Sequence, residues 1–206
     1  MNELQTAPPA AESCLVFSYA SRGRKGGTFI DEAVLDLAAH EARMKDPGSY
    51  RPAECRCGGS RLHLHGRRDR KVRGVAGLVV VSVVIFLCAK CSATWRVLPA
   101  FLARCLWRTW DVVEAALFEP ERLVAAPVPA RTVQRWHARL MQAALAATQA
   151  LATSGEPALR AVAQRVGQVA SREALAVAYA AAVELSSRLA PLAALLHRLS
   201  PGLRLM

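Results

Sequence analysis

Four of the six cysteines in this 206-residue sequence lie in two close pairs. One residue separates Cys55 from Cys57, and two residues separate Cys88 from Cys91. Paired cysteines at such spacing are typical of metal sites, and zinc accepts four thiolates because it has no geometric preference of its own. The sequence therefore predicts a zinc ion bound by these four thiolates.

The first cysteine pair has a shorter spacer than is usual, which leaves a second ligand set open. His63 or His65, two residues apart on one face of an expected strand, could replace one thiolate. The alternative, which we favour, places both histidines on the strand surface. The remaining cysteines, Cys14 and Cys105, have no partner nearby in the sequence, and we expect them to be small buried side chains.

The charge of the chain indicates a polyanionic partner. The net charge is +11 and the isoelectric point is about 10.1, which favours nucleic acid or an anionic membrane surface. Residues 43–108, which contain both cysteine pairs, carry as much net charge as the whole chain. Basic side chains crowd one expected hairpin there, and we expect them to contact phosphates without reading sequence: Arg67, Arg68, Arg70, Lys71 and Arg73.

The elements that position these residues follow from the hydrophobic pattern. Apolar residues at helical spacing predict a helix over 28–44. Short antiparallel strands are expected over 53–99, among them the valine-rich run Val79–Phe86 and the segment ATWRVLP. Beyond Pro99 the sequence is rich in Ala, Leu and Arg at helical spacing, so helices are expected.

Residues 128–140 are expected to form an amphipathic helix whose two faces differ in chemistry. Val133, Trp136 and Leu140 make an apolar face. The opposite face carries long side chains suited to base edges in the major groove of DNA: Arg131, Gln134, Arg135 and Arg139. The alternative is an ordinary helix with a solvated basic face. All four tryptophans are expected in the core: Trp95, Trp107, Trp110 and Trp136.

These motifs together resemble a known class of proteins. Cys-x-Cys-Gly-Gly, HLHGRRDR, a hydrophobic strand and Cys-x-x-Cys-x-x-Thr-Trp resemble the N-terminal zinc ribbon of bacterial insertion-sequence transposases. Bacterial proteins that carry such a ribbon ahead of a helix-turn-helix are more similar still. The segment VPARTVQRWHARL resembles the second half of a helix-turn-helix, with 106–118 and 120–126 as the preceding helices. The resemblance implies zinc, DNA as a partner, and a protein accessory to or derived from a mobile element.

The expected fold is α+β and mainly α, with a small antiparallel zinc ribbon followed by a helix-turn-helix and an Ala/Leu-rich helical bundle. The expected domains are an N-terminal loop and helix (1–49), a zinc-ribbon-like domain (50–100), a helix-turn-helix (101–152) and a C-terminal helical segment (153–206). Helices over 157–168 and 171–198 either complete a bundle or form a homodimer interface, and the sequence leaves this choice open.

We expect a cytoplasmic DNA-binding protein that is not an enzyme and takes no small-molecule substrate. The sequence shows no recognisable secretory signal, transposase carboxylate site, Gly-rich phosphate loop or Ser/His/Asp arrangement. One alternative is a protein-interaction adaptor with a structural zinc ribbon. The other is a small membrane-associated protein that uses the uncharged run 74–89, although a spanning helix needs about 20 apolar residues.

Overall fold

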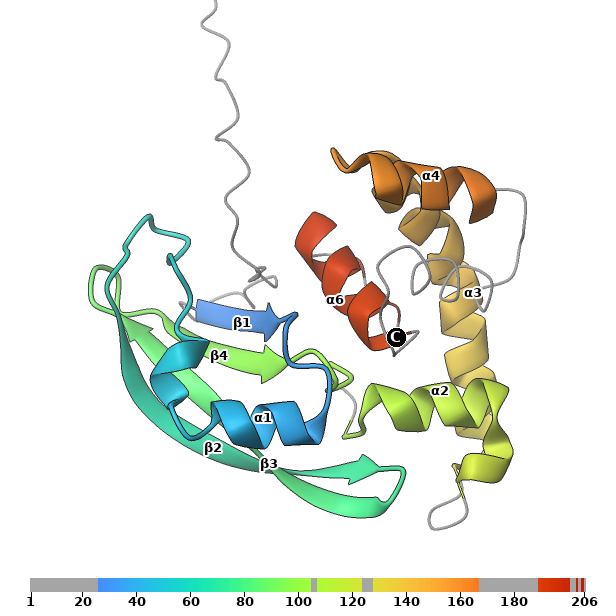
Figure 1. Cartoon of the computed structure of the whole chain (residues 1–206), viewed down its shortest axis with the longest axis horizontal. Coiled ribbons are helices and arrows are strands. Elements are labelled where there is room, and N and C mark those ends of the chain that lie inside the picture. Colours follow the sequence, from blue (N-terminus) through green and yellow to red (C-terminus); the bar gives the residue numbers. More distant parts are fainter. Residues whose placement is uncertain are drawn as a thin grey trace, which may run out of the picture.

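The computed structural model describes residues 26–104, 107–123, 128–166 and 189–200, together with Leu203 and Leu205. A four-stranded sheet packs beside a group of helices (Figure 1). The strands are β1 (Gly26–Asp31), β2 (Leu62–Gly74), β3 (Gly77–Cys88) and β4 (Thr94–Pro99), in the order β1-β4-β3-β2. β1 runs parallel to β4, and the other neighbouring strands are antiparallel. The molecule is thus a mixed α and β structure.

β2 and β3 form a long, curved hairpin (Figure 1). The valine-rich run that the sequence predicts as a strand lies inside β3, and β4 covers all of ATWRVLP except its first residue, Ala93, so both strands are confirmed. Gly77 closes the hairpin with a φ of +127°, which favours glycine. β4 pairs with β3 only over Val84–Leu87. The rest of the hairpin, Arg68–Val83, extends beyond β4, and we call it the distal hairpin.

The prediction of a helix over 28–44 is wrong for the first part of that segment. β1 takes up its first residues, and the helix α1 (Leu37–Arg43) takes up only its last part. Phe29 of β1 packs on Trp95 of β4 with 4.8 Å between ring centroids. Pairing with a strand distant in sequence therefore outweighs the helical spacing of the apolar residues. Asp36 caps α1, since its carboxylate accepts a 2.7 Å hydrogen bond from the backbone N–H three residues later.

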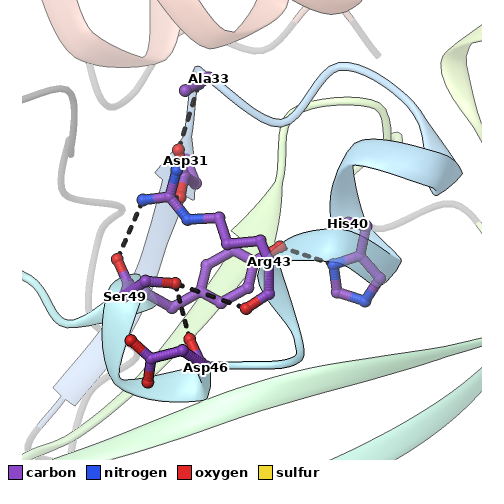
Figure 2. Close-up of polar contacts among 7 residues, drawn as sticks. Asp31, Ala33, His40, Arg43, Asp46 and Ser49 are labelled. Carbon is purple, nitrogen blue, oxygen red and sulfur yellow. Dashed lines mark hydrogen bonds and ion pairs between the residues drawn. The ribbon is translucent and has the colours of Figure 1, made fainter.

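Polar contacts hold α1 and the short 3₁₀ helix η1 (Pro47–Tyr50) against the sheet (Figure 2). The guanidinium of Arg43 lies 3.0 Å from the buried carboxylate of Asp31 in β1. His40 shares a 2.7 Å hydrogen bond with the hydroxyl of Tyr50. Burial lowers the pKa of His40 below its usual value, which favours the neutral ring. The segment that follows β1 is therefore part of the same packed unit as the sheet.

The helices beyond Pro99 pack around a core of their own. They are α2 (Trp110–Phe118), the single 3₁₀ turn η2 (Pro120–Arg122), α3 (Ala130–Ala152), α4 (Pro157–Val166) and α6 (Leu189–Leu199). Trp110, Trp136 and Leu192 are buried together in this core, so α6 joins the same bundle as α2 and α3. A small cluster that includes Ile30 and Ala194 connects the bundle to β1.

The helix predictions are confirmed only where the structure describes them. α3 begins at Ala130 and covers most of the helix expected over 128–140, and α4 covers most of 157–168. Between α2 and α3, the described residues hold only the single turn η2, so the helix-turn-helix arrangement stays a prediction. The positions of Cys14 and Cys105, and most of 171–198, lie outside the described residues.

The uncharged run 74–89, which raised the membrane alternative, forms the hairpin turn and β3. In the part of the chain that the structure describes, no helix has the length and apolar character needed to cross a membrane. The run instead supplies the sheet core, since Val81, Val83 and Phe86 are buried there.

Candidate metal centre and basic surfaces

Two loops bring the four paired cysteines together at one end of the sheet. Cys55 and Cys57 precede β2, Cys88 ends β3, and Cys91 lies in the turn before β4. Their sulfur atoms all lie within 4.8 Å of one another. The Cys55–Cys91 and Cys57–Cys88 sulfur pairs are 3.6 Å apart. A disulfide bond is about 2.05 Å long, so these are free thiols, and together they could hold a metal ion.

Each loop is a tight turn closed by backbone hydrogen bonds. In the first loop, the N–H of Gly58 donates to the carbonyl of Cys55 at 2.8 Å, and the N–H of Cys55 donates to the carbonyl of Gly59 at 2.9 Å. Gly58 has a φ of +71°, a conformation that favours glycine. In the second loop, the N–H of Ser92 donates to the carbonyl of Cys88 at 2.9 Å. The one-residue spacer of the first pair therefore still forms a turn that delivers both thiols.

Three neighbouring residues shape the cluster. A Cβ atom on Gly59 would lie only 3.1 Å from the sulfur of Cys88, so a side chain there would crowd the thiol. The indole N–H of Trp95 donates to the sulfur of Cys55 at 3.3 Å. The ammonium of Lys90 donates to a backbone carbonyl of the first loop at 3.1 Å and places a positive charge beside the thiols.

The backbone favours the ionised form of one thiol. Hydrogen bonding from the N–H of Cys91, with a further contribution from that of Lys90, lowers the pKa of Cys88 to about 7. Burial raises the pKa of Cys55 and of Cys57. Thiolates packed this closely repel one another, and a divalent cation offsets that repulsion. The cluster is therefore built so that metal binding stabilises it.

The distances and the donor type fit zinc. A Zn–S bond of about 2.3 Å places the sulfurs of a tetrahedral site about 3.8 Å apart, close to the 3.6 Å pairs in the cluster. Thiolates also favour zinc over magnesium and calcium, which take oxygen ligands. His63 and His65 are exposed in β2 and do not belong to the cluster. The four thiols meet without them, so the geometry requires no histidine ligand.

The distal hairpin and the residue before it carry the predicted basic side chains. Arg67, Arg68, Lys71 and Arg73 are exposed, and Arg70 is half-buried. Within the described ranges, no carboxylate forms an ion pair with any of the four exposed cations. Because side chains alternate along a strand, Arg68 and Arg70 lie on one face and Lys71 and Arg73 on the other. Both faces of the strand therefore present positive charge.

α3 separates its apolar and polar side chains as the sequence predicts. Trp136 and Leu140 are buried in the helical core, and Val133 is partly buried against it. The side chains predicted to contact DNA are all exposed: Arg131, Gln134, Arg135 and Arg139. The amphipathic pattern is confirmed, and contact of the polar face with DNA stays a prediction.

The distal hairpin and α3 are connected through residues between β4 and α2, whose role the sequence did not indicate. The backbone N–H of Arg73 donates to the carbonyl of Trp107 at 3.0 Å, and Arg73 and Arg108 form an isolated β-bridge. The guanidinium of Arg108 lies 5.2 Å from the ring centroid of Trp136 in α3. A short chain of contacts thus joins the two basic surfaces.

The prediction that Trp107 lies in the core is wrong. Its side chain is 65% exposed, whereas Trp95, Trp110 and Trp136 are each at most 5% exposed. The helix expected over 106–118 would have included Trp107, but α2 begins only at Trp110.

No protein-family model, curated protein or solved structure matches this sequence. Function must therefore be inferred from the cysteine cluster and the two basic surfaces. The cluster can hold a metal ion, and the surfaces offer positive charge and long hydrogen-bond donors.

Proposed function

We propose that this chain is a nucleic-acid-binding protein with a structural zinc ion. The exposed cations of β2 contact phosphates, and the polar face of α3 reads base edges in the major groove of duplex DNA. The observation that carries the proposal is the charge of β2, because four exposed cations lie within seven consecutive residues and form no ion pair within the described ranges. Such a strip suits a phosphate backbone, which releases counterions when cations bind.

Zinc would act at the base of the hairpin that carries this charge. β3 ends at Cys88, and the loop with Cys55 and Cys57 leads into β2. A zinc ion held by the four thiolates, Cys91 included, would connect the start of β2 to the end of β3. Structural zinc contributes folding free energy directly, so it would fix the direction in which the hairpin points.

The specificity that we assign to α3 comes from its side chains and its position. Arg reads guanine and Gln reads adenine through paired hydrogen bonds, and Arg131, Gln134 and Arg135 are exposed in the first two turns. The resemblance of the cysteine pattern to transposase ribbons supports a role as an accessory or derivative of a mobile element.

The phosphate contacts can be tested by the salt dependence of binding to a duplex of random sequence. Four or five contacts predict a slope of log K against log salt between about −3.5 and −4.5, since each contact releases about 0.9 ions. Arg68→Ala should make the slope less steep by about 0.9. Arg160→Ala, which removes an exposed arginine from α4, should leave it unchanged. A slope near zero for the unaltered protein would mean that β2 is only a solvated strand.

A protein-interaction adaptor is the second candidate, and one observation favours it. Leu78 and Val80, two residues apart in β3, are 64% and 58% exposed. Neighbouring exposed apolar side chains suit a protein interface more than a phosphate backbone. Leu78→Ser would weaken the binding of a protein partner and leave the slope of log K against log salt for DNA unchanged. This result would separate the two candidates.

A further inference from the structure

Trp107 is the one tryptophan of this chain that lies at the surface. It is 65% exposed, and the other three are at most 5% exposed. A large flat ring in water forgoes the stabilisation that burial gives to an aromatic side chain. The exposure of this ring is therefore a feature to explain from its surroundings.

The backbone holds Trp107 in a fixed position beside the distal hairpin. Its carbonyl accepts a 3.0 Å hydrogen bond from Arg73, and the N–H of Thr109 donates to the carbonyl of Arg73 at 3.0 Å. The hydroxyl of Thr109 also donates to this carbonyl, at 3.2 Å. Arg73 thus bonds to the residues on both sides of Arg108, as in a sheet. The ring is presented from a strand-like bridge, which limits the entropy lost when a ligand binds.

One cation lies against the exposed ring, and two more lie along the backbone bridge beside it. The guanidinium of Arg70 lies 5.6 Å from the ring centroid, and both residues line the same small pocket. Burial lowers the pKa of Arg108, and the nearby positive charge of Arg73 lowers it further. The buried Nε of Arg108 has no hydrogen-bond partner among the described residues. Within those residues no carboxylate forms an ion pair with Arg73 or Arg108.

An exposed aromatic ring beside a cation matches a ligand with a flat apolar part and an adjacent anionic group. A nucleotide within a single strand has this form, because its unpaired base offers a face and its phosphates carry charge. A duplex keeps its bases stacked, so their faces are not accessible to a side chain. A lipid surface fits less well, because the exposed Leu78 and Val80 pair with Arg73 and Lys71 on the opposite face of the hairpin from Arg70. The Trp107 ring would therefore enter a lipid surface without Leu78 or Val80.

We propose that Trp107, with Arg70, forms a binding site for an unpaired base of single-stranded nucleic acid. The base stacks on the indole, and Arg70 contacts a phosphate that flanks it. This inference rests on the proposed nucleic-acid-binding function and adds a second substrate class to it. The protein would hold duplex DNA through β2 and α3, and an unpaired strand at the junction between them.

Tryptophan fluorescence of the full, zinc-loaded chain provides the test, because Trp107 dominates the surface-accessible signal. A thymine oligonucleotide of about 15 nucleotides should quench the fluorescence, and a duplex of equal length should not. Trp107→Ala should lower affinity for the oligonucleotide about tenfold, as loss of one stacked base does, with duplex affinity unchanged. Trp107→Phe keeps an aromatic face, so it should retain the affinity and lose the quenching.

Two controls keep the result interpretable. Leu145→Ala, which removes a side chain that is 69% exposed on α3, should change neither affinity nor quenching. Unfolding temperatures of the variants should match that of the unaltered chain, because Trp107 contributes little to either core. The inference is wrong if Trp107→Ala binds the oligonucleotide normally, or if phosphatidylserine vesicles shift the Trp107 emission and the oligonucleotide does not.

The outcomes also separate this inference from the proposed function. If the duplex binds with the expected salt slope and the oligonucleotide leaves Trp107 unquenched, the single-strand site fails alone. If no duplex binds and the oligonucleotide still quenches Trp107, duplex recognition fails and the single-strand site stands. If neither binds, both are overturned.

Discussion

At the scale of single residues, the cysteine cluster depends on neighbours that cannot themselves bind metal. Gly59 leaves room for the sulfur of Cys88, and the indole N–H of Trp95 reaches the sulfur of Cys55. The cysteines were predictable because their spacing alone indicates a site. The part played by Trp95 was not, because it arises where strands distant in sequence meet.

We expect the protein purified without added metal to contain about one zinc ion per chain. The binding free energy of structural zinc is about 10–16 kcal/mol, which exceeds the free energy of unfolding of many domains. Cys88→Ser and Cys55→Ser should therefore both lose the zinc and unfold the sheet at ordinary temperature. Elemental analysis, with circular dichroism before and after a chelator, measures both effects.

The matched controls for zinc binding are His63→Ala and His65→Ala, since both rings are exposed and lie outside the cluster. Neither change should alter zinc content. Loss of zinc in either variant would show that a histidine does act as a ligand. A chain without zinc that withstands the chelator would refute the metal site altogether.

At the scale of elements, the sequence predicts those whose own pattern decides their structure. The valine-rich run of β3 and the amphipathic repeat of α3 are strong local signals, and both elements form as predicted. β1 has a helical spacing of apolar residues, yet it is a strand because it pairs with β4. Parallel pairing over such a separation in sequence leaves no local trace, so it could not be predicted.

The pairing of β1 with β4 can be tested at Gly26. Its φ is +123°, and a Cβ atom there would overlap the backbone oxygen of Thr94 in β4. Gly26→Ala should therefore lower the free energy of unfolding by about 1–3 kcal/mol, as measured by urea denaturation. Gly66→Ala in β2 is the control, because nothing lies near its Cβ position, and it should change stability by less than about 1 kcal/mol. Equal effects at both positions would count against the β1–β4 pairing.

At the scale of the whole molecule, the charge is divided between two surfaces of different chemistry. The distal hairpin presents cations on a strand, and α3 presents Arg and Gln on a helix. The bridge between Arg73 and Arg108, and the contact of Arg108 with Trp136, join these surfaces. One nucleic acid that meets the junction could therefore contact both surfaces at once.

This division predicts that affinity and sequence choice can be separated by mutation. Arg135→Ala should relax base preference at one position of the recognised site, because a paired Arg–guanine contact gives about 1–3 kcal/mol of discrimination. Arg68→Ala should weaken binding to all sequences alike, because phosphate contacts carry no sequence information. Selection of bound duplexes from a random pool, with the unaltered chain and both variants, measures each effect. If the unaltered chain enriches no motif, or if Arg135→Ala leaves the motif intact, α3 only supports the fold, and the charge of β2 accounts for binding by itself.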